Sequence, residues 1–254
     1  MLENKIFGMI SLGCDKNRVD AERLLGIIRA KGYPITDDIA EANILIVNTC
    51  AFLESARREA IDTVLDWLEG EAPWLPDAPS VRLEHVTMMR ADQLARMQGM
   101  ALKPALTTQV IFPFAEWRSY RAALTAENLD AVCAVDEMAR AADAFALSSD
   151  APATTWADAD QVLTSVMAAV TRRDAVGGFF GKRHAVSPAV ALSLYTGRAA
   201  RVMPTSGKVG VIAPGARAHF VTLTGNPLSC VPEAIDDIRV SGTWRDGVKL
   251  WPKA

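Results

Sequence analysis

The sequence lacks the patterns that mark several common classes of protein. Its 254 residues contain four cysteines, widely spaced and without a Cys-x-x-Cys pair, which argues against a disulfide scaffold. No apolar run approaches the roughly 18 to 20 residues that a membrane-spanning helix needs. Acidic Glu3 and the absence of a small-residue cleavage site after Cys14 argue against a signal peptide. The formal net charge of −3 gives no basic surplus that would indicate a nucleic-acid partner. We therefore expect a cytoplasmic globular protein with no nucleic-acid and no membrane partner.

The composition changes near residue 70. Residues 1–70 contain nine isoleucines, whereas residues 71–254 contain four. The stretch Glu69–Ser80 between them has three prolines and no hydrophobic period, which is typical of a linker. Either two domains of one protein differ this much, or two pieces of different origin are joined here. The expected parts are 1–69, a linker or seam over 70–79, and then 80–203 and 204–254.

Regular hydrophobic patterns predict alternating strands and helices in the first part. They place strands over 5–13 and 43–50 and helices over 20–32 and 55–70. This order indicates a βαβα fragment of a parallel sheet. Cys14 and Cys50 then follow the carboxyl ends of the two strands, the edge where open α/β sheets place their ligands.

The segments "SLGCDKNRVDAERLLG" and "ANILIVNTCAFLESARREAIDTVL" resemble the start of the methylthiotransferases. These radical-SAM enzymes add a methylthio group to RNA or to a ribosomal protein, and "GCDKN" is closer to the ribosomal-protein branch. The resemblance implies that Cys14 and Cys50 are two of three cysteines that hold a [4Fe–4S] cluster. However, the next cysteine is Cys133, and the C-x-x-x-C-x-x-C triplet of the radical-SAM barrel is absent. Since a cluster normally requires three or four thiolates, buried inert cysteines are favoured over a cluster here.

Strand and helix patterns also alternate after residue 80. They predict strands over 80–85, 100–109 and 144–150, helices over 91–99, 127–143, 159–173 and 187–203, and β-hairpins in the tail. His85 and Asp150 fall at the carboxyl ends of two of these strands. A (β/α)₈ barrel places its catalytic residues at that edge.

The motifs "RLEHVTMM", "FALSSDAP", "SPAVALSLYTGRAA" and "GVIAPGARAHFVTLTGNPL" resemble the last strands, closing helix and β-sandwich of metal-dependent amidohydrolases. The resemblance implies a divalent metal, usually zinc, with His85 and Asp150 as metal ligands, or with His85 polarising the scissile carbonyl. The alternative for His85 is a histidine that is satisfied in the core. The resemblance also implies that Asp150 is catalytic, because the matching aspartate takes a proton from the hydrolytic water and passes it to the leaving amine. Two residues depart from the family pattern: Ser148 stands where glycine is usual, and His219 where aspartate is usual.

Most of the family's metal ligands are missing from the sequence. There is no H-x-H pair, and the remaining histidines, His184 and His219, lie in an expected loop and in the tail. One histidine and one aspartate do not make a zinc site, which needs at least three protein ligands.

The sequence therefore predicts a chimeric α/β protein: a βαβα fragment joined to the last three strands of a (β/α)₈ barrel, with a small C-terminal β-sandwich. The leading function is metal-dependent hydrolysis of C–N bonds in a small amide-type substrate, with little or no activity in this chain. One alternative is a fragment of an iron–sulfur methylthiotransferase. The other is a non-catalytic remnant whose exposed barrel edges lead to oligomerisation or aggregation.

Overall fold

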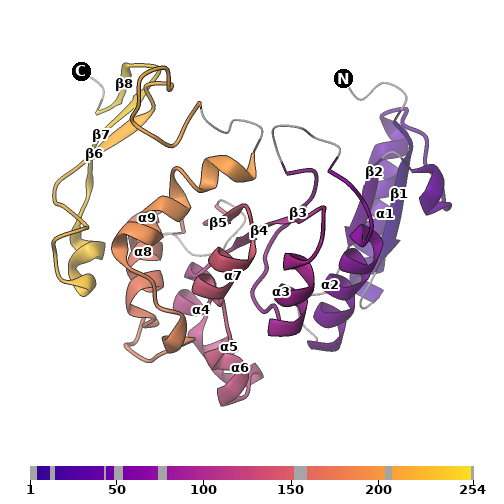
Figure 1. Cartoon of the computed structure of the whole chain (residues 1–254), viewed down its shortest axis with the longest axis horizontal. Coiled ribbons are helices and arrows are strands. Elements are labelled where there is room, and N and C mark those ends of the chain that lie inside the picture. The colour runs from indigo at the N-terminus through magenta and orange to yellow at the C-terminus, as the bar shows by residue number, and fades with distance from the viewer. Residues whose placement is uncertain are drawn as a thin grey trace. The chain divides into compact units, whose positions relative to one another are not determined.

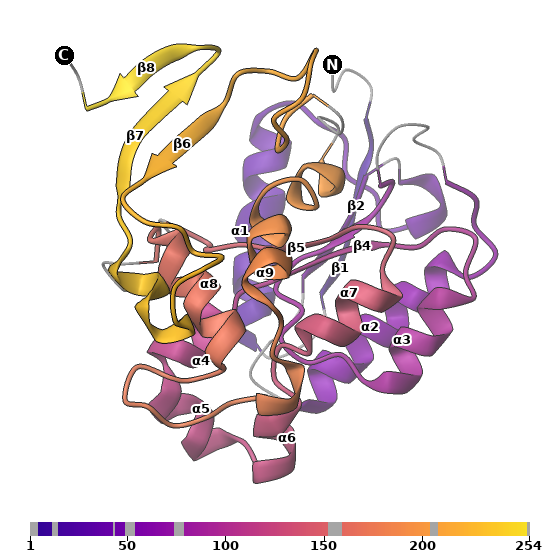
Figure 2. The ribbon, with the colours of Figure 1, turned by 60° about the vertical axis from the view of Figure 1, so that its left-hand side comes forward.

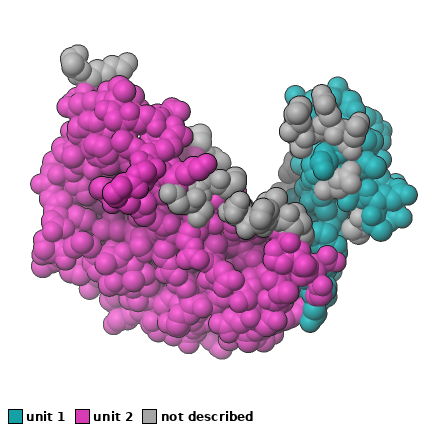
Figure 3. Space-filling model, turned by 45° about the horizontal axis from the view of Figure 1, so that its top comes forward, with its two compact units in different colours: residues 1–69 teal, residues 70–254 magenta. Residues whose placement is uncertain are grey.

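The computed structural model describes residues 5–11, 15–42, 44–48, 54–73, 79–151, 159–203 and 208–252. The chain divides into two compact units, Met1–Glu69 and Gly70–Ala254, which Figure 3 colours separately. Within the described residues, none of the helices has both the length and the apolar character needed to cross a membrane. Cys14 and Cys50 lie outside the described residues.

The first unit contains a parallel pair of strands joined through a helix. Its elements are β1 (Phe7–Ser11), α1 (Asp15–Ala30), the short 3₁₀ helix η1 (Ile39–Glu41), β2 (Ile44–Asn48) and α2 (Glu54–Leu68). In the β1–β2 pair, Phe7 lies opposite Ile44, and Ser11 lies opposite Asn48. The predicted βαβα order is confirmed. Helix α1 starts five residues earlier than predicted and is followed by Gly32 at φ +85°, a left-handed conformation that favours glycine at a helix end.

The second unit is built on three short parallel strands. They are β3 (Arg82–Leu83), β4 (Ala105–Thr108) and β5 (Phe145–Leu147), in the order β3-β4-β5. Helix α3 (Ala91–Gln98) connects β3 to β4. The longer connection from β4 to β5 contains α4 (Ile111–Ala115), α5 (Trp117–Ala123), α6 (Ala126–Asp130) and α7 (Val135–Ala141). Helices α3 and α7 lie side by side (Figure 1). Three parallel strands with helical crossovers are what the sequence predicts for this part.

The core of the second unit follows from the apolar runs of the central strands. All four residues of β4 and all three of β5 are buried, as expected for parallel strands that are covered on both faces. Leu106 is 0% exposed and Phe145 1%.

After β5 come α8 (Val162–Thr171), the 3₁₀ helix η2 (Lys182–His184) and α9 (Pro188–Tyr195), and α8 packs against α9. The 3₁₀ helix η3 (Ala199–Val202) then contributes Val202 to a cluster with the alanines of β4 and β5.

The predicted helix over 127–143 is wrong, because the chain leaves the helical path at Cys133. Helix α6 ends at Asp130, α7 begins at Val135, and Cys133 between them has φ +47°. The Cys133 N–H donates to the carbonyl of Thr87 over 2.7 Å. The carbonyls of Val132 and Cys133 accept from the Arg172 guanidinium at 2.6 and 3.1 Å. Tertiary hydrogen bonds thus take the backbone groups that a continuous helix would use.

The predicted helix over 187–203 is also shorter in the structure. Ser187 caps α9 by accepting the Val190 N–H, and Pro188 follows at the first helical position, as the sequence predicts. The helix ends at Tyr195, and the remaining residues form a turn at Gly197 and the helix η3. The N–H of Arg198 turns back to the carbonyl of Ser193 at 2.8 Å, which closes the helix.

The C-terminal tail forms one three-stranded antiparallel sheet. Its strands are β6 (Phe220–Leu223), β7 (Val240–Arg245) and β8 (Val248–Trp251), in that order (Figure 2). The β7–β8 hairpin is confirmed, and its turn at Asp246-Gly247 has φ +51° and +78°, which such two-residue turns require.

Two predictions for the tail are wrong. Residues 210–228 do not form a hairpin of their own, because their one strand, β6, pairs with β7 across the 3₁₀ helix η4 (Pro232–Asp237). In place of a β-sandwich, the described part of the tail has a single sheet.

Candidate functional site

The carboxyl ends of the three parallel strands bring several polar side chains to one edge of the sheet. His85 follows β3 by two residues, Gln109 follows β4 directly, and Ser148 follows β5 directly. Asp150 lies two residues beyond Ser148. Because parallel strands end at the same edge, residues far apart in the sequence become neighbours here.

Three of these side chains form a continuous hydrogen-bond relay. His85 Nδ1 lies 3.2 Å from Gln109 Oε1, and Gln109 Nε2 donates to Ser148 Oγ over 2.6 Å. Gln109 is 2% exposed, so it lies beneath the more accessible His85. The Tyr195 hydroxyl donates to the carbonyl of Ser148 over 3.4 Å. Burial raises the pKa of Tyr195, so the hydroxyl keeps its proton and remains a donor.

The backbone holds His85 in an uncommon conformation. Its φ of +58° lies in the left-handed region, which costs a residue with a Cβ atom about 1 to 2 kcal/mol. The His85 carbonyl accepts the Thr87 N–H over 2.7 Å, and the next residue, Val86, donates its N–H to the carbonyl of Thr107 over 2.9 Å. The imidazole stacks on Phe112, with ring centroids 6.1 Å apart. These contacts aim the His85 ring at the end of β4.

Asp150 does not join the relay. It is half-buried and has φ +56°. In the part of the chain that the structure describes, no hydrogen bond or ion pair links its carboxylate to His85, Gln109 or Ser148. The structure therefore links His85 to Ser148 through Gln109, whereas among the described residues no hydrogen bond or ion pair links His85 to Asp150.

The residues of this edge do not fit a catalytic zinc centre. Among the described residues, no three His, Cys, Asp or Glu side chains gather where they could hold a metal ion. Zinc in hydrolases is held by three protein ligands, and the amide of Gln109 is already occupied by His85 and Ser148. Cys14 and Cys50 lie outside the described residues, so the predicted iron–sulfur ligands remain a prediction.

Sequence reasoning missed Gln109 altogether. The sequence feature that could have identified Gln109 is its position directly after the buried run "ALTT". The residue after a parallel strand lies at the edge of the sheet where the strands end. Ser148 is recognisable from the sequence as a departure from the family pattern. Its hydrogen bond to Gln109 is not, because the two residues are 39 positions apart.

A group of buried polar residues adjoins the relay through β4. Thr108, the last residue of that strand, donates its hydroxyl to the Cys133 thiol at 3.4 Å. Burial raises the pKa of Cys133, so the thiol stays protonated at neutral pH. Burial lowers the pKa of Arg172 to about 10, which leaves its guanidinium charged. A charged arginine can donate to the backbone carbonyl of Cys133, and the neutral thiol shows no activation as a nucleophile.

His184 is buried instead of lying in an exposed loop. It is 1% exposed, its Nδ1 lies 2.6 Å from Asp136 Oδ1, and its Nε2 accepts from Arg183 Nε over 3.0 Å. The pKa of Asp136 is lowered: burial raises it, but the hydrogen bonds from His184 and Arg140 outweigh burial. Both nitrogens of His184 are therefore occupied by structural partners.

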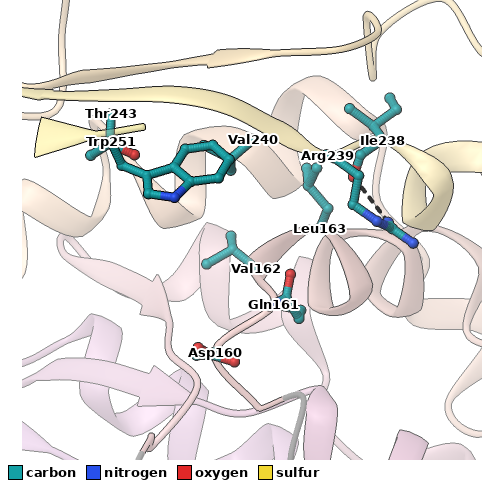
Figure 4. Close-up of a pocket in the computed structure, with 9 residues that line it drawn as sticks. All are labelled: Asp160, Gln161, Val162, Leu163, Ile238, Arg239, Val240, Thr243 and Trp251. Atoms are coloured by element: carbon teal, nitrogen blue, oxygen red, sulfur yellow. Dashed lines mark hydrogen bonds between the residues drawn. The ribbon is translucent and has the colours of Figure 1, made fainter. Parts of the chain in front are cut away.

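An open pocket of about 560 Å³ lies between the start of α8 and the C-terminal sheet (Figure 4). It is lined by Asp160, Gln161, Val162 and Leu163 on one side and by Ile238, Arg239, Val240, Thr243 and Trp251 on the other. The Arg239 guanidinium donates to the carbonyls of Asp236 and Ile238. None of the residues of the relay lines this pocket, so it is separate from the carboxyl edge.

Comparisons with known proteins assign the two parts of the chain to different families. The chain belongs to the amidohydrolase family, whose model matches residues 53–250. A second model, described as uncharacterized protein family UPF0004, matches residues 6–74. The two matches overlap over residues 53–74, around the change in composition.

The similar curated proteins match the N-terminal part. One is a ribosomal protein uS12 methylthiotransferase RimO of Lachnoclostridium phytofermentans, 54% identical over 65 residues, or 26% of this chain and 14% of that protein. Another, of the same description, is from Clostridium botulinum and is 56% identical over 62 residues, or 24% and 14%. The chain therefore spans about one seventh of the length of the curated relatives that it matches.

Among solved structures, an amidohydrolase from Thermotoga maritima MSB8 is similar with a TM-score of 0.43 and 13% sequence identity, covering 96% of this chain and 62% of that one. The family matches confirm the predicted chimera: a RimO-type N-terminal segment precedes an amidohydrolase segment in one chain.

Proposed function

We propose that residues 80–254 derive from a metal-dependent hydrolase of amide-type C–N bonds, and that this chain by itself does not catalyse that reaction. One observation supports the proposal above others. The polar side chains at the strand ends satisfy one another through Gln109, and among the described residues no third metal ligand accompanies His85 and Asp150. In a complete hydrolase Asp150 would move the proton of the attacking water and His85 would bind the metal. With two such groups the donor set is too small for a zinc site, so no hydrolytic step follows from it.

The first prediction concerns metal binding and Asp150. The protein is loaded with zinc or cobalt, freed of excess metal, and assayed with amide and N-formyl substrates. We expect much less than one bound metal ion per chain and equal background hydrolysis by the wild type and Asp150→Asn. Asp143→Asn is a matched control, since Asp143 precedes β5, is largely exposed and lies 3.5 Å from Lys103. Stoichiometric metal together with activity that Asp150→Asn loses and Asp143→Asn keeps would refute the proposal.

A second candidate function is an iron–sulfur methylthiotransferase fragment that acts on a ribosomal protein or tRNA. The identity of 54% to a RimO protein over 65 residues favours it. Cys14 and Cys50 would be the cluster ligands, and two thiolates are fewer than such clusters need.

The second prediction follows from that ligand count. After anaerobic reconstitution with iron and sulfide, we expect no stable cluster absorbance. Cys14→Ser and Cys50→Ser should look like the wild type, and so should Cys230→Ser, which changes a half-buried cysteine of the tail. A cluster that forms in the wild type and in Cys230→Ser, but not in the other two variants, would establish the second candidate instead.

A further inference from the structure

We propose that Gln109 is a positioning residue. Held by Ser148, it fixes His85 in the tautomer that is protonated on Nδ1. The lone pair of His85 Nε2 is then available to a ligand at the edge of the sheet where the parallel strands end. The inference takes this edge as the functional site, and in that respect it rests on the proposed function. It concerns the metal-free protein, however, and does not depend on whether the chain hydrolyses anything.

The donor and acceptor roles follow from the chemistry of the amide. Gln109 Oε1, a carbonyl oxygen, lies 3.2 Å from His85 Nδ1, and a carbonyl oxygen can only accept a hydrogen bond. His85 Nδ1 must therefore carry the proton. A neutral imidazole has one N–H, so Nε2 is left with a free lone pair.

Ser148 holds the other end of the amide; a hydroxyl can accept from the amide NH₂ group or donate to the amide oxygen, and the structure has the first arrangement. Gln109 Nε2 donates to Ser148 Oγ over 2.6 Å, and burial of Gln109 removes water that could replace either partner. The reverse orientation of the amide would place its NH₂ group against His85 and would require the opposite tautomer. The tautomer of His85 thus reports which way Gln109 points.

Two further contacts restrict the imidazole ring itself. Phe112 stacks on one face with an interplanar angle of 17°, and the left-handed backbone of His85 is held by its carbonyl bond to Thr87. A histidine that binds a metal or moves a proton characteristically donates its other N–H to a fixed acceptor, which orients the ring and raises its basicity. Gln109 supplies that acceptor to His85.

The other two histidines of the chain provide internal references for both tautomers. His184 has Nδ1 against the Asp136 carboxylate and Nε2 accepting from Arg183, so it carries its proton on Nδ1. His219 has Nδ1 accepting the backbone N–H of Asp246 over 3.4 Å, so its proton is on Nε2. The pattern of His85 can therefore be compared, in one spectrum, with two histidines whose contacts assign opposite tautomers.

The test is a long-range proton–nitrogen correlation spectrum of the isotope-labelled, metal-free protein, recorded about two units above the ordinary imidazole pKa of ~6.5 so that free imidazoles are neutral. In the wild type, His85 should show the pattern of His184 and the opposite of His219. Gln109→Leu should move His85 to the Nε2–H pattern that unconstrained imidazoles favour. Gln109→Glu should restore the Nδ1–H pattern, because a carboxylate also accepts from Nδ1.

Gln93→Leu is the matched control, because Gln93 is also 2% exposed and its Oε1 accepts the Arg90 N–H on α3, away from the relay. It should leave the His85 pattern unchanged.

A wild-type His85 protonated on Nε2 would overturn the inference without any variant. So would a Gln109→Leu protein that keeps the Nδ1–H pattern. If Gln109→Leu does not fold, Ser148→Ala is the second variant, and it should give His85 a mixture of both patterns; an unchanged pattern would also overturn the inference. Because no outcome depends on hydrolysis, failure here is distinct from failure of the proposed function.

Discussion

The guanidinium of Arg172 lies wholly inside the second unit, and its hydrogen bonds go to backbone carbonyls instead of a carboxylate. Nε donates to Phe180 and Gly181 at 3.2 and 3.0 Å, and Nη2 donates to Val132 and Cys133. The same group stacks on the Phe180 ring, 4.6 Å from its centroid. Arg172 therefore ties the loop after α8 to the break between α6 and α7.

The third prediction concerns the stability that this residue provides. Arg172→Met keeps an unbranched apolar stem but takes the donor from the carbonyls of Val132 and Phe180, each at a cost of about 1 to 3 kcal/mol. The carbonyls of Cys133 and Gly181 keep the N–H groups of Val135 and His184. Removing the buried charge offsets part of that cost, so we expect a net loss of about 3 kcal/mol in the free energy of unfolding. Chemical denaturation measures it.

Arg198→Met is the control for this substitution. Arg198 is half-buried and donates to one carbonyl, that of Ala139, over 2.8 Å. Its loss should cost about 1 kcal/mol, the usual value for one hydrogen bond. Equal effects of the two substitutions would mean that Arg172 does not hold the loop to the helix break.

At the scale of helices and strands, the sequence predicted those elements whose hydrophobic pattern fits only a strand or only a helix. The run "ILIVN" is a strand rich in β-branched Ile and Val, and "ALTT" is a buried strand that ends in two β-branched threonines. The strand-end positions of His85 and Asp150 follow from the predicted strands over 80–85 and 144–150, which the structure has as β3 and β5. Sequence patterns alone therefore indicated the edge at which the relay is found.

Sequence patterns did not predict the features that depend on tertiary contacts. The apolar period of 127–143 continues through Cys133, but Thr87 and Arg172 take the backbone hydrogen bonds there and end the helix. Gln109 carries no motif, since its role depends on side chains from two other strands. His184 sits in a segment rich in glycine and basic residues that is typical of an exposed loop, and its burial follows from its bond to Asp136.

At the scale of the whole molecule, two family matches meet in one chain, and the parallel sheet of the second unit is open within the described residues. The amidohydrolase segment contributes three parallel strands to the described structure, where a (β/α)₈ barrel has eight. Its first strand, β3, has two residues and pairs on one side with β4. A closed barrel has no sheet edges, whereas an open sheet has two, and such edges pair readily with other chains.

The tail adds a second edge of this kind. All four residues of β8 are exposed, with Val248 at 63% and Trp251 at 52%. Within the described residues β8 pairs with β7 on one side. Lysine on an edge strand opposes pairing with another chain, and β8 has one, Lys249.

The fourth prediction is therefore self-association of the metal-free protein. Sedimentation velocity should show a coefficient that rises with concentration, because open edges and exposed apolar side chains pair between copies. Val248→Lys should weaken this dependence if the β8 edge takes part. Val176→Lys is the matched control, since Val176 is 59% exposed in the loop after α8 and belongs to no strand. A sedimentation coefficient that does not change with concentration in the wild type would mean that the chain covers its own sheet edges. If both variants weakened self-association equally, the cause would be the added net charge and not strand pairing.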